Sequence, residues 1–329
     1  MALMKHFNTK IKADENTGFG TNSDFYGGRL VNKDGSPNIR KKGLGFFEGT
    51  SWFHTMLLMP GWKFFFTIFI FFISINFLFA IIYFTIGTEN LGGITSTSSL
   101  ERFAQTFFFS AQTFTTVGYG HINPQSIAAS AIAAFEALLG LLSFALATGL
   151  LYGRFSRPQS YLRFSDHALI APYKDGIALM MRMAPFKNNH LTDAEVKLTI
   201  GMTIEENGKI VNKFYNPQLE LSKINSLTLS WTIVHTISEE SPLYQLNIED
   251  LKNVKTEILL FVKAFDETFS NTVVTRTSYT ANEIVTGAKF TPMYHRSESG
   301  GTTVLELDKL NAYVKADISF ALQQTQVNG

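Results

Sequence analysis

The chain has no cysteine among its 329 residues, so disulfide bonds, thiolate metal sites and thiol nucleophiles are all excluded. Charged side chains are also scarce, because Asp, Glu, Lys and Arg make up only 17% of the sequence. The formal net charge of +1 argues against a protein that binds nucleic acid through bulk positive charge. By contrast, 45% of the residues are hydrophobic and 31 are phenylalanine, so part of the chain must lie in a more apolar environment than a soluble surface.

The shortage of charge is concentrated in residues 64–157, which contain three basic and three acidic side chains. Residues 64–86 contain no Asp, Glu, Lys, Arg or His, and a helix of that length, at about 1.5 Å per residue, crosses the roughly 30 Å hydrocarbon core of a bilayer. A second apolar run, residues 126–151, is rich in Ala, Ser and Gly, which let membrane helices pack closely. We therefore predict a membrane domain over residues 60–157, with an outer helix at about 62–87 and an inner helix at about 125–155.

Basic residues flank the outer ends of this pair of spans, whereas the loop between the spans contains only Arg102. By the positive-inside rule, both termini are predicted to be cytoplasmic in a multi-pass protein of the cell (inner) membrane. The flanking basic residues are Arg40, Lys41, Lys42 and Lys63 before the first span, and Arg154, Arg157 and Arg163 after the second.

The segment between the spans, residues 98–124, contains an apolar run that is too short to cross the bilayer. Ser98 and Glu101 have the spacing of a capping box, which predicts a half-helix at about 99–114. The chain then returns through the sequence TVGYG, residues 116–120. A short helix followed by TVGYG between two spans is typical of the pore helix and selectivity filter of potassium channels.

The filter sequence has a physical explanation. K⁺ must lose its water to be distinguished from Na⁺, and backbone carbonyls can replace that water. We expect Gly118 and Gly120 to adopt positive φ, Thr116 to add a hydroxyl oxygen, and Val117 and Tyr119 to point away from the axis and pack against the pore helix. Since one chain supplies one strand of the filter, the sequence predicts a homotetramer that conducts K⁺ and needs no organic cofactor.

Outside the membrane domain, two further regions are predicted. Residues 46–59 place Trp52 and Met56 at helical spacing, which indicates an amphipathic helix at the membrane surface that follows an N-terminal cytoplasmic segment, residues 1–45; an ordinary packed soluble helix is the alternative. Residues 158–329 contain short β-rich runs separated by turn sequences, which indicates an antiparallel β sandwich large enough to bury a core.

With these features, the chain resembles the inward-rectifier potassium channel superfamily, in particular its prokaryotic, KirBac-type branch. The resemblance implies a two-span α-helical pore, a cytoplasmic all-β immunoglobulin-like domain, and a passive gated K⁺ channel that is not an enzyme. The segments that carry it are RLVNKDGSPNIRKKG (29–43), SWFHTMLL (51–58), GLLYGRFSRP (149–158), SWTIVHTISEESPLY (230–244) and TRTSYTANEIVTGAKF (275–290).

The resemblance also implies roles for residues of the inner helix. Tyr152 matches the gate at the bundle crossing, where four aromatic rings could exclude water. Gly140 and Gly149 match inner-helix glycines, which permit either bending or close helix packing. Arg154 and Arg157 match basic residues that sense anionic lipid, although a simple topological anchor is the alternative. Trp52 and Lys63 are further candidates for contact with lipid headgroups.

Three departures from the family pattern qualify these expectations. Gln112 stands where many members carry a pore-helix Glu that braces the filter, so the brace is either uncharged or uses Glu136. We expect Glu136 to lie near the inner side of the filter, and the alternative is a carboxylate that lines the cavity. Phe144 occupies a position that is acidic in strongly rectifying members, so strong polyamine block is not expected. Gln159 and Ser160 replace a lysine cluster, so inhibition by phosphoinositide, or insensitivity to it, is as plausible as activation.

Two other functions are compatible with the sequence. The chain could be the ion-translocating subunit of a potassium uptake system, but such subunits usually hold several pore-loop repeats and this chain has one. Alternatively, the pore could be vestigial and the soluble domain a membrane-anchored binding module.

Overall fold

The structure is a computed structural model that describes residues 13, 29–43, 45, 51–206 and 209–318. Most of the predicted segment 1–45 and residues 46–50 of the predicted interfacial helix therefore lie outside the described residues. The chain divides into two compact units, which are described separately. One unit is Lys42–Arg157, and the other combines Met1–Lys41 with Pro158–Gly329.

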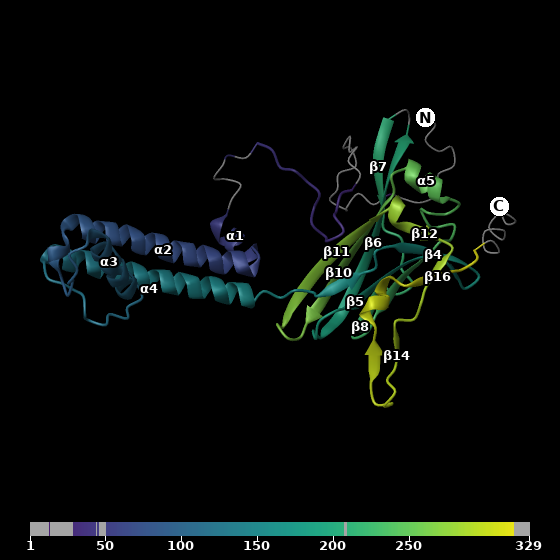
Figure 1. Cartoon of the computed structure of the whole chain (residues 1–329). Helices are drawn as coiled ribbons and strands as arrows, with labels where there is room; N and C mark the ends of the chain where they lie inside the picture. Colours follow the sequence, from purple (N-terminus) through teal and green to yellow (C-terminus); the bar gives the residue numbers. More distant parts are fainter. Residues whose placement is uncertain (1–12, 14–28, 44, 46–50, 207–208, 319–329) are drawn as a thin grey trace. The chain divides into compact units, whose positions relative to one another are not determined.

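The first unit, the pore unit, contains two helices that are long and apolar enough to cross a membrane. They are α2 and α4, and the shorter helix α3 packs against both of them (Figure 1). Pro60 separates α1 from α2, because proline supplies no N–H for a continuous helix. The elements are α1 (Trp52–Leu58), α2 (Gly61–Ile86), η1 (Thr88–Asn90), β1 (Leu91–Gly92), α3 (Ser99–Phe114), β2 (Asn123–Pro124) and α4 (Ile127–Phe155).

The start of α3 differs from the prediction. Ser98 is the N-cap residue, but its side chain makes no capping hydrogen bond, so the predicted capping box is wrong. Instead, the Ser96 hydroxyl bonds to the Glu101 carboxylate and also accepts the Ser98 N–H at 3.2 Å. Ser96 thus bonds to the Ser98 N–H and to the Glu101 carboxylate, the two groups that a capping box would have paired with each other.

Beyond the two ends of α3, the chain is tied together by a short antiparallel ladder. Leu91 pairs with Pro124 and Gly92 with Asn123. Gly93 has a φ of +87°, and a Cβ at this position would lie 1.9 Å from the carbonyl oxygen of His121. Only glycine allows this close approach, which holds the segment after the filter against the segment before α3.

The second unit, the β unit, is the sandwich expected from the sequence. One sheet has the order β11-β10-β6-β7 with β8 on β6, and the other has the order β12-β4-β5-β3 with β9 on β5. Their bounds are β3 (Leu162–Phe164), β4 (Ala168–Tyr173), β5 (Gly176–Pro185), β6 (Leu191–Glu206), β7 (Lys209–Tyr215), β8 (Lys223–Ser226), β9 (Trp231–Thr236), α5 (Ile248–Asn253), β10 (Glu257–Asp266), β11 (Asn271–Thr280), η2 (Ala281–Glu283), β12 (Ile284–Thr286), β13 (Ala288–Phe290), β14 (Tyr294–Arg296), β15 (Thr303–Leu305), η3 (Leu307–Asn311) and β16 (Tyr313–Lys315).

The core of this unit lies between the two sheets. On β10, alternate side chains such as Ile258, Leu260 and Val262 are buried, as expected for a strand with one face toward the core. They join Leu179 and Met181 of β5 in a single cluster, so both sheets share one core.

A buried arginine fastens the C-terminal segment to this core. The Arg182 guanidinium donates to the carbonyl oxygens of Thr291 at 2.5 Å, Lys309 at 2.7 Å and Leu310 at 2.8 Å. It also lies 4.3 Å from the centre of the Phe290 ring. Burial lowers the pKa of Arg182 to about 10, so the side chain remains charged at neutral pH.

The described N-terminal residues complete the same unit. Glu257 accepts hydrogen bonds from the N–H groups of Leu30 at 2.7 Å and Val31 at 3.1 Å, and Arg29 forms an ion pair with Glu283. Burial raises the pKa of Glu257, whereas these two N–H groups lower it. Residues 29–38 are thereby attached to the ends of β10 and β11, more than two hundred residues along the chain.

His235 on β9 is a buried histidine with both ring nitrogens bonded. Nδ1 lies 2.8 Å from the Gln218 carbonyl and must carry the proton, so neutral Nε2 accepts from the Ser241 hydroxyl at 2.8 Å. Burial lowers the pKa of His235 below its ordinary value of 6.5, although the Gln218 bond acts in the opposite direction.

This arrangement predicts that the full-length protein loses stability in weak acid. The unfolded chain takes up a proton on His235 below about pH 6.5, whereas the folded chain resists it, so the contribution of His235 is complete above that pH and is lost as the pH falls toward the folded pKa. His235→Asn should flatten the dependence of melting temperature on pH between about 7 and 5. His190→Asn, at an exposed position, is the matched control and should leave the slope unchanged. An unaltered slope in His235→Asn would contradict the assignment.

Candidate functional site

The chain leaves the end of α3 through backbone hydrogen bonds that point back toward the helix. Val117 N–H donates to the Gln112 carbonyl at 2.9 Å, and Gly118 N–H approaches the same oxygen at 3.3 Å. Thr116 N–H donates to the Thr113 carbonyl at 3.0 Å. Three successive N–H groups are therefore satisfied on the helix side.

The carbonyl groups of the same residues have no such partner. Within the described part of the chain, no donor bonds to the carbonyl oxygens of residues 116–120. The backbone has positive φ at Thr116 (59°), Gly118 (52°) and Gly120 (80°), which confirms the expectation for both glycines. A β-branched residue such as Thr116 is strained in this conformation, and strained backbone gathers at functional sites.

Two side chains of this segment are largely uncovered within a single chain. Val117 is 52% exposed and Tyr119 is 79% exposed. Their packing against the pore helix stays a prediction.

Glu136 lies in a polar cluster that joins three helices. It is 0% exposed, and the Tyr83 hydroxyl of α2 donates to its Oε2 at 2.7 Å. Its Oε1 bonds to the Ser110 hydroxyl of α3, and Ser110 Oγ is also 3.0 Å from Asn76 Oδ1 of α2. Glu136 therefore contacts α3 and is fully covered within this chain, which favours the predicted place beside the filter over a place on a cavity wall.

Tyr83, Ser110 and Asn76 were not among the residues predicted for this site. Asn76 could have indicated the cluster, since it is an amide in the middle of an otherwise apolar run. Polar side chains inside a span almost always face protein partners. Gln112 contributes to the site through its carbonyl oxygen.

The two inner-helix glycines have different surroundings. A Cβ on Gly140 would lie 1.9 Å from the Phe114 carbonyl oxygen, so α4 packs directly against the end of α3. Gly149 has no neighbouring atom within 4 Å of that position. Close packing therefore accounts for Gly140 but not for Gly149. Phe144 lines an apolar groove of the pore unit that also includes Thr116 and Phe114.

The C-terminal end of α4 contains the residues predicted as the gate and as lipid contacts. Tyr152 is 74% exposed, and Arg157 is also exposed. Arg154, however, donates to the carbonyl oxygens of Met56 at 3.3 Å and Leu57 at 3.5 Å, at the end of α1. A cation at this position compensates the free carbonyls of a helix C-terminus. Of the remaining lipid candidates, Trp52 and Lys63 are exposed.

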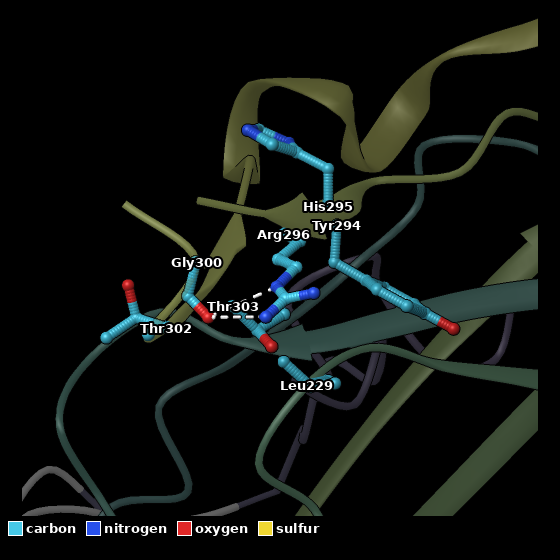
Figure 2. Close-up of a pocket in the computed structure, with 8 residues that line it drawn as sticks. Leu229, Tyr294, His295, Arg296, Gly300, Thr302 and Thr303 are labelled. Atoms are coloured by element: carbon cyan, nitrogen blue, oxygen red, sulfur yellow. Dashed lines mark hydrogen bonds between the residues drawn. The ribbon is translucent and has the colours of Figure 1, made fainter. Parts of the chain in front are cut away.

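The β unit contains a separate pocket beside the β14–β15 hairpin. Figure 2 shows Arg296 there with its guanidinium directed at Gly300. Its Nε and Nη2 donate to the Gly300 carbonyl at 3.1 and 3.0 Å, so the Arg296 guanidinium is bonded within the hairpin connection. Among the described residues, no group of three or more His, Asp or Glu side chains could hold a metal ion.

Comparison with known proteins places these features in a family. Residues 162–328 match the model of the inward rectifier potassium channel C-terminal domain, and residues 70–157 match the ion channel model. The chain belongs to the inward rectifier potassium channel family. It is 32% identical over 289 residues to the inward rectifier potassium channel Kirbac3.1 of Paramagnetospirillum magnetotacticum, covering 86% of this chain and 95% of that protein.

More distant relatives come from animals. The G protein-activated inward rectifier potassium channel 1 of Bos taurus is 26% identical over 303 residues, covering 82% of this chain and 58% of that protein. The inward rectifier potassium channel irk-1 of Caenorhabditis elegans is 26% identical over 221 residues, covering 64% of this chain and 41% of that protein. The chain is accordingly a membrane protein of an ion channel family and not an enzyme.

The contact at Gly140 generates a prediction. Gly140→Ala forces the Phe114 carbonyl away from α4, which should destabilise the folded channel by about 1–3 kcal/mol, the usual cost of overpacking. Thermal unfolding of the purified full-length protein measures this effect. Gly149→Ala is the matched control, because its Cβ meets no atom within 4 Å. Equal melting temperatures for the two variants would count against close packing at Gly140.

Proposed function

We propose that four copies of this chain form a passive, gated, K⁺-selective channel in the cell membrane. The observation that carries the proposal is the backbone of residues 116–120, whose N–H groups at 116–118 are used on the side of α3 while the carbonyl oxygens lack donors. Free carbonyls are the ligands that replace the hydration shell of K⁺. The permeant ion is the only ligand that this arrangement requires.

The tetramer is required by the filter geometry. One strand offers carbonyl oxygens from one side only, whereas a dehydrated ion needs them all round, and a closed ring of identical strands provides this. The exposed side chains of Val117 and Tyr119 support a neighbouring copy beside the filter. The exposed Phe144 adds an apolar, uncharged surface, which argues against strong polyamine block at this position.

The gate is assigned to Tyr152. Its exposed ring near the end of α4 meets three equivalent rings when four inner helices converge, and a ring of aromatic side chains closes a pore by excluding water. The contact of Arg154 with the end of α1 links the same stretch of α4 to the interfacial helix. A displacement of α1 is therefore transmitted to the gate.

Binding of anionic lipid headgroups is assigned to the exposed side chains at the ends of α4 and α1–α2. Arg154 already serves the carbonyls of α1, so Arg157 is the better candidate for a headgroup, with Lys63 and Trp52 at the same end of the unit. Such basic clusters beside a span attract anionic headgroups. This arrangement, like the distribution of Lys and Arg, supports cytoplasmic termini.

The filter is tested by Gly118→Ala. At positive φ a Cβ costs about 1–2 kcal/mol per residue, and the tetramer repeats this cost in every subunit. We expect barium-sensitive Rb⁺ uptake into liposomes to fall by at least about tenfold, or to lose its preference over Na⁺. Gly176→Ala in the β unit, which has neither positive φ nor a neighbour within 4 Å, is the control. Selective uptake that survives Gly118→Ala would remove the assignment of the filter.

The gate is tested by Tyr152→Ala, with Tyr152→Phe as the control that keeps the ring. Removal of four rings widens the constriction, so the alanine variant should show a higher open probability in single-channel recordings and several-fold faster Rb⁺ uptake. The phenylalanine variant should behave as the wild type. If the alanine variant, like the phenylalanine variant, opens no more often than the wild type, Tyr152 does not form the constriction.

A further inference from the structure

The polar cluster around Glu136 contains a number of hydrogens that can be counted. Ser110 has one hydroxyl hydrogen, yet its Oγ lies within hydrogen-bond distance of two acceptors, Glu136 Oε1 and Asn76 Oδ1. The Asn76 amide is oriented by its Nδ2, which donates to the Phe72 carbonyl at 2.7 Å. In the reversed orientation, two acceptor oxygens would face each other at that distance.

An ionised Glu136 leaves this cluster one hydrogen short. A carboxylate only accepts, so the Ser110 hydrogen serves either Glu136 or Asn76, and the other oxygen stays buried without a donor. Within the described residues, no Lys or Arg forms an ion pair with Glu136. A buried charge without a counter-ion is strongly unfavourable.

A protonated Glu136 completes the cluster. Its Oε1–H donates to Ser110 Oγ, which releases the Ser110 hydrogen for Asn76 Oδ1. Its Oε2 accepts from the Tyr83 hydroxyl, and Asn76 Nδ2 continues the chain to the Phe72 carbonyl. Both Glu136 oxygens, Ser110 Oγ and Asn76 Oδ1 are then all bonded, and each hydroxyl or carboxyl hydrogen of the cluster has an acceptor.

We propose that Glu136 is a neutral carboxylic acid in the folded channel and that it is a positioning residue for the filter. It holds α3 at Ser110, two residues before Gln112, whose carbonyl receives the N–H groups of Val117 and Gly118. The part that concerns selectivity rests on the proposed function. The protonation state does not.

The protonation state is tested by infrared spectroscopy of the full-length channel in lipid at neutral pH. The difference spectrum between wild type and Glu136→Gln should show the loss of one carbonyl stretching band of a protonated carboxylic acid. Glu101→Gln is the control and should retain the band, because Glu101 lies at an exposed position on α3, where its carboxylate bonds to Ser96. Loss of a carboxylate band in Glu136→Gln, with no change in the carboxylic-acid region, would overturn the proposal.

The positioning role is tested by rescue. In Glu136→Gln the amide nitrogen donates to Ser110 and the amide oxygen accepts from Tyr83, so the cluster stays complete. Glu136→Ala removes both bonds, and we expect its ratio of Rb⁺ to Na⁺ uptake to fall by at least about tenfold, which is the factor for the loss of a single buried hydrogen bond, while Glu136→Gln keeps the wild-type ratio. Only preparations that remain tetrameric in detergent are compared. A glutamine variant as unselective as the alanine variant would show that the carboxylate charge is needed, and equal wild-type ratios in both would show that Glu136 does not position the filter.

These outcomes are separable from failure of the proposed function. If the wild-type channel shows no selective uptake, the channel function fails, while the infrared comparison still decides the state of Glu136.

Discussion

A helix that ends inside a bilayer leaves backbone groups without water to bond, and the chain that follows must satisfy them. Here the N–H groups of Val117 and Gly118 meet that requirement by turning back to the Gln112 carbonyl. The same turn leaves the carbonyl oxygens of residues 116–120 without donors in the described part of the chain. Two contacts from α4 hold α3 in place, because Glu136 bonds to Ser110 and Gly140 lies against the carbonyl of Phe114.

Backbone carbonyls also hold positive charge elsewhere in this protein. Arg182 is surrounded by main-chain oxygens from residues 291–312, and Arg154 by those at the end of α1. Neither arginine forms an ion pair in the part of the chain that the structure describes. Neutral dipoles therefore position a cation at both of these places, and the proposed filter uses the same chemistry for a permeant ion. For such an ion dipoles have an advantage, since they bind it less tightly than a fixed carboxylate would.

The features of this protein that could be predicted are those encoded in continuous stretches of sequence. Two apolar runs predict the spanning helices, TVGYG predicts the proposed filter, and the β-rich runs after Pro158 predict the sandwich, because each signal lies within a continuous stretch of the sequence. The capping of α3 could not be predicted correctly, because Ser96, outside the usual spacing, competes for Glu101. The partners of Glu136 and Arg154 come from other helices, so their roles depend on tertiary packing that no short stretch of sequence records.

The attachment of residues 29–38 to the ends of β10 and β11 has a consequence for biosynthesis. Those strands are translated long after the N-terminal segment, and both membrane helices lie between them in the sequence. The early segment cannot be bound until the last third of the chain has been synthesised, and the strand ends that receive it stay uncovered until then. The β unit is thus completed only after the membrane helices have been synthesised, so any delay in releasing the C-terminal strands prolongs the exposure of an incomplete sheet to other nascent chains.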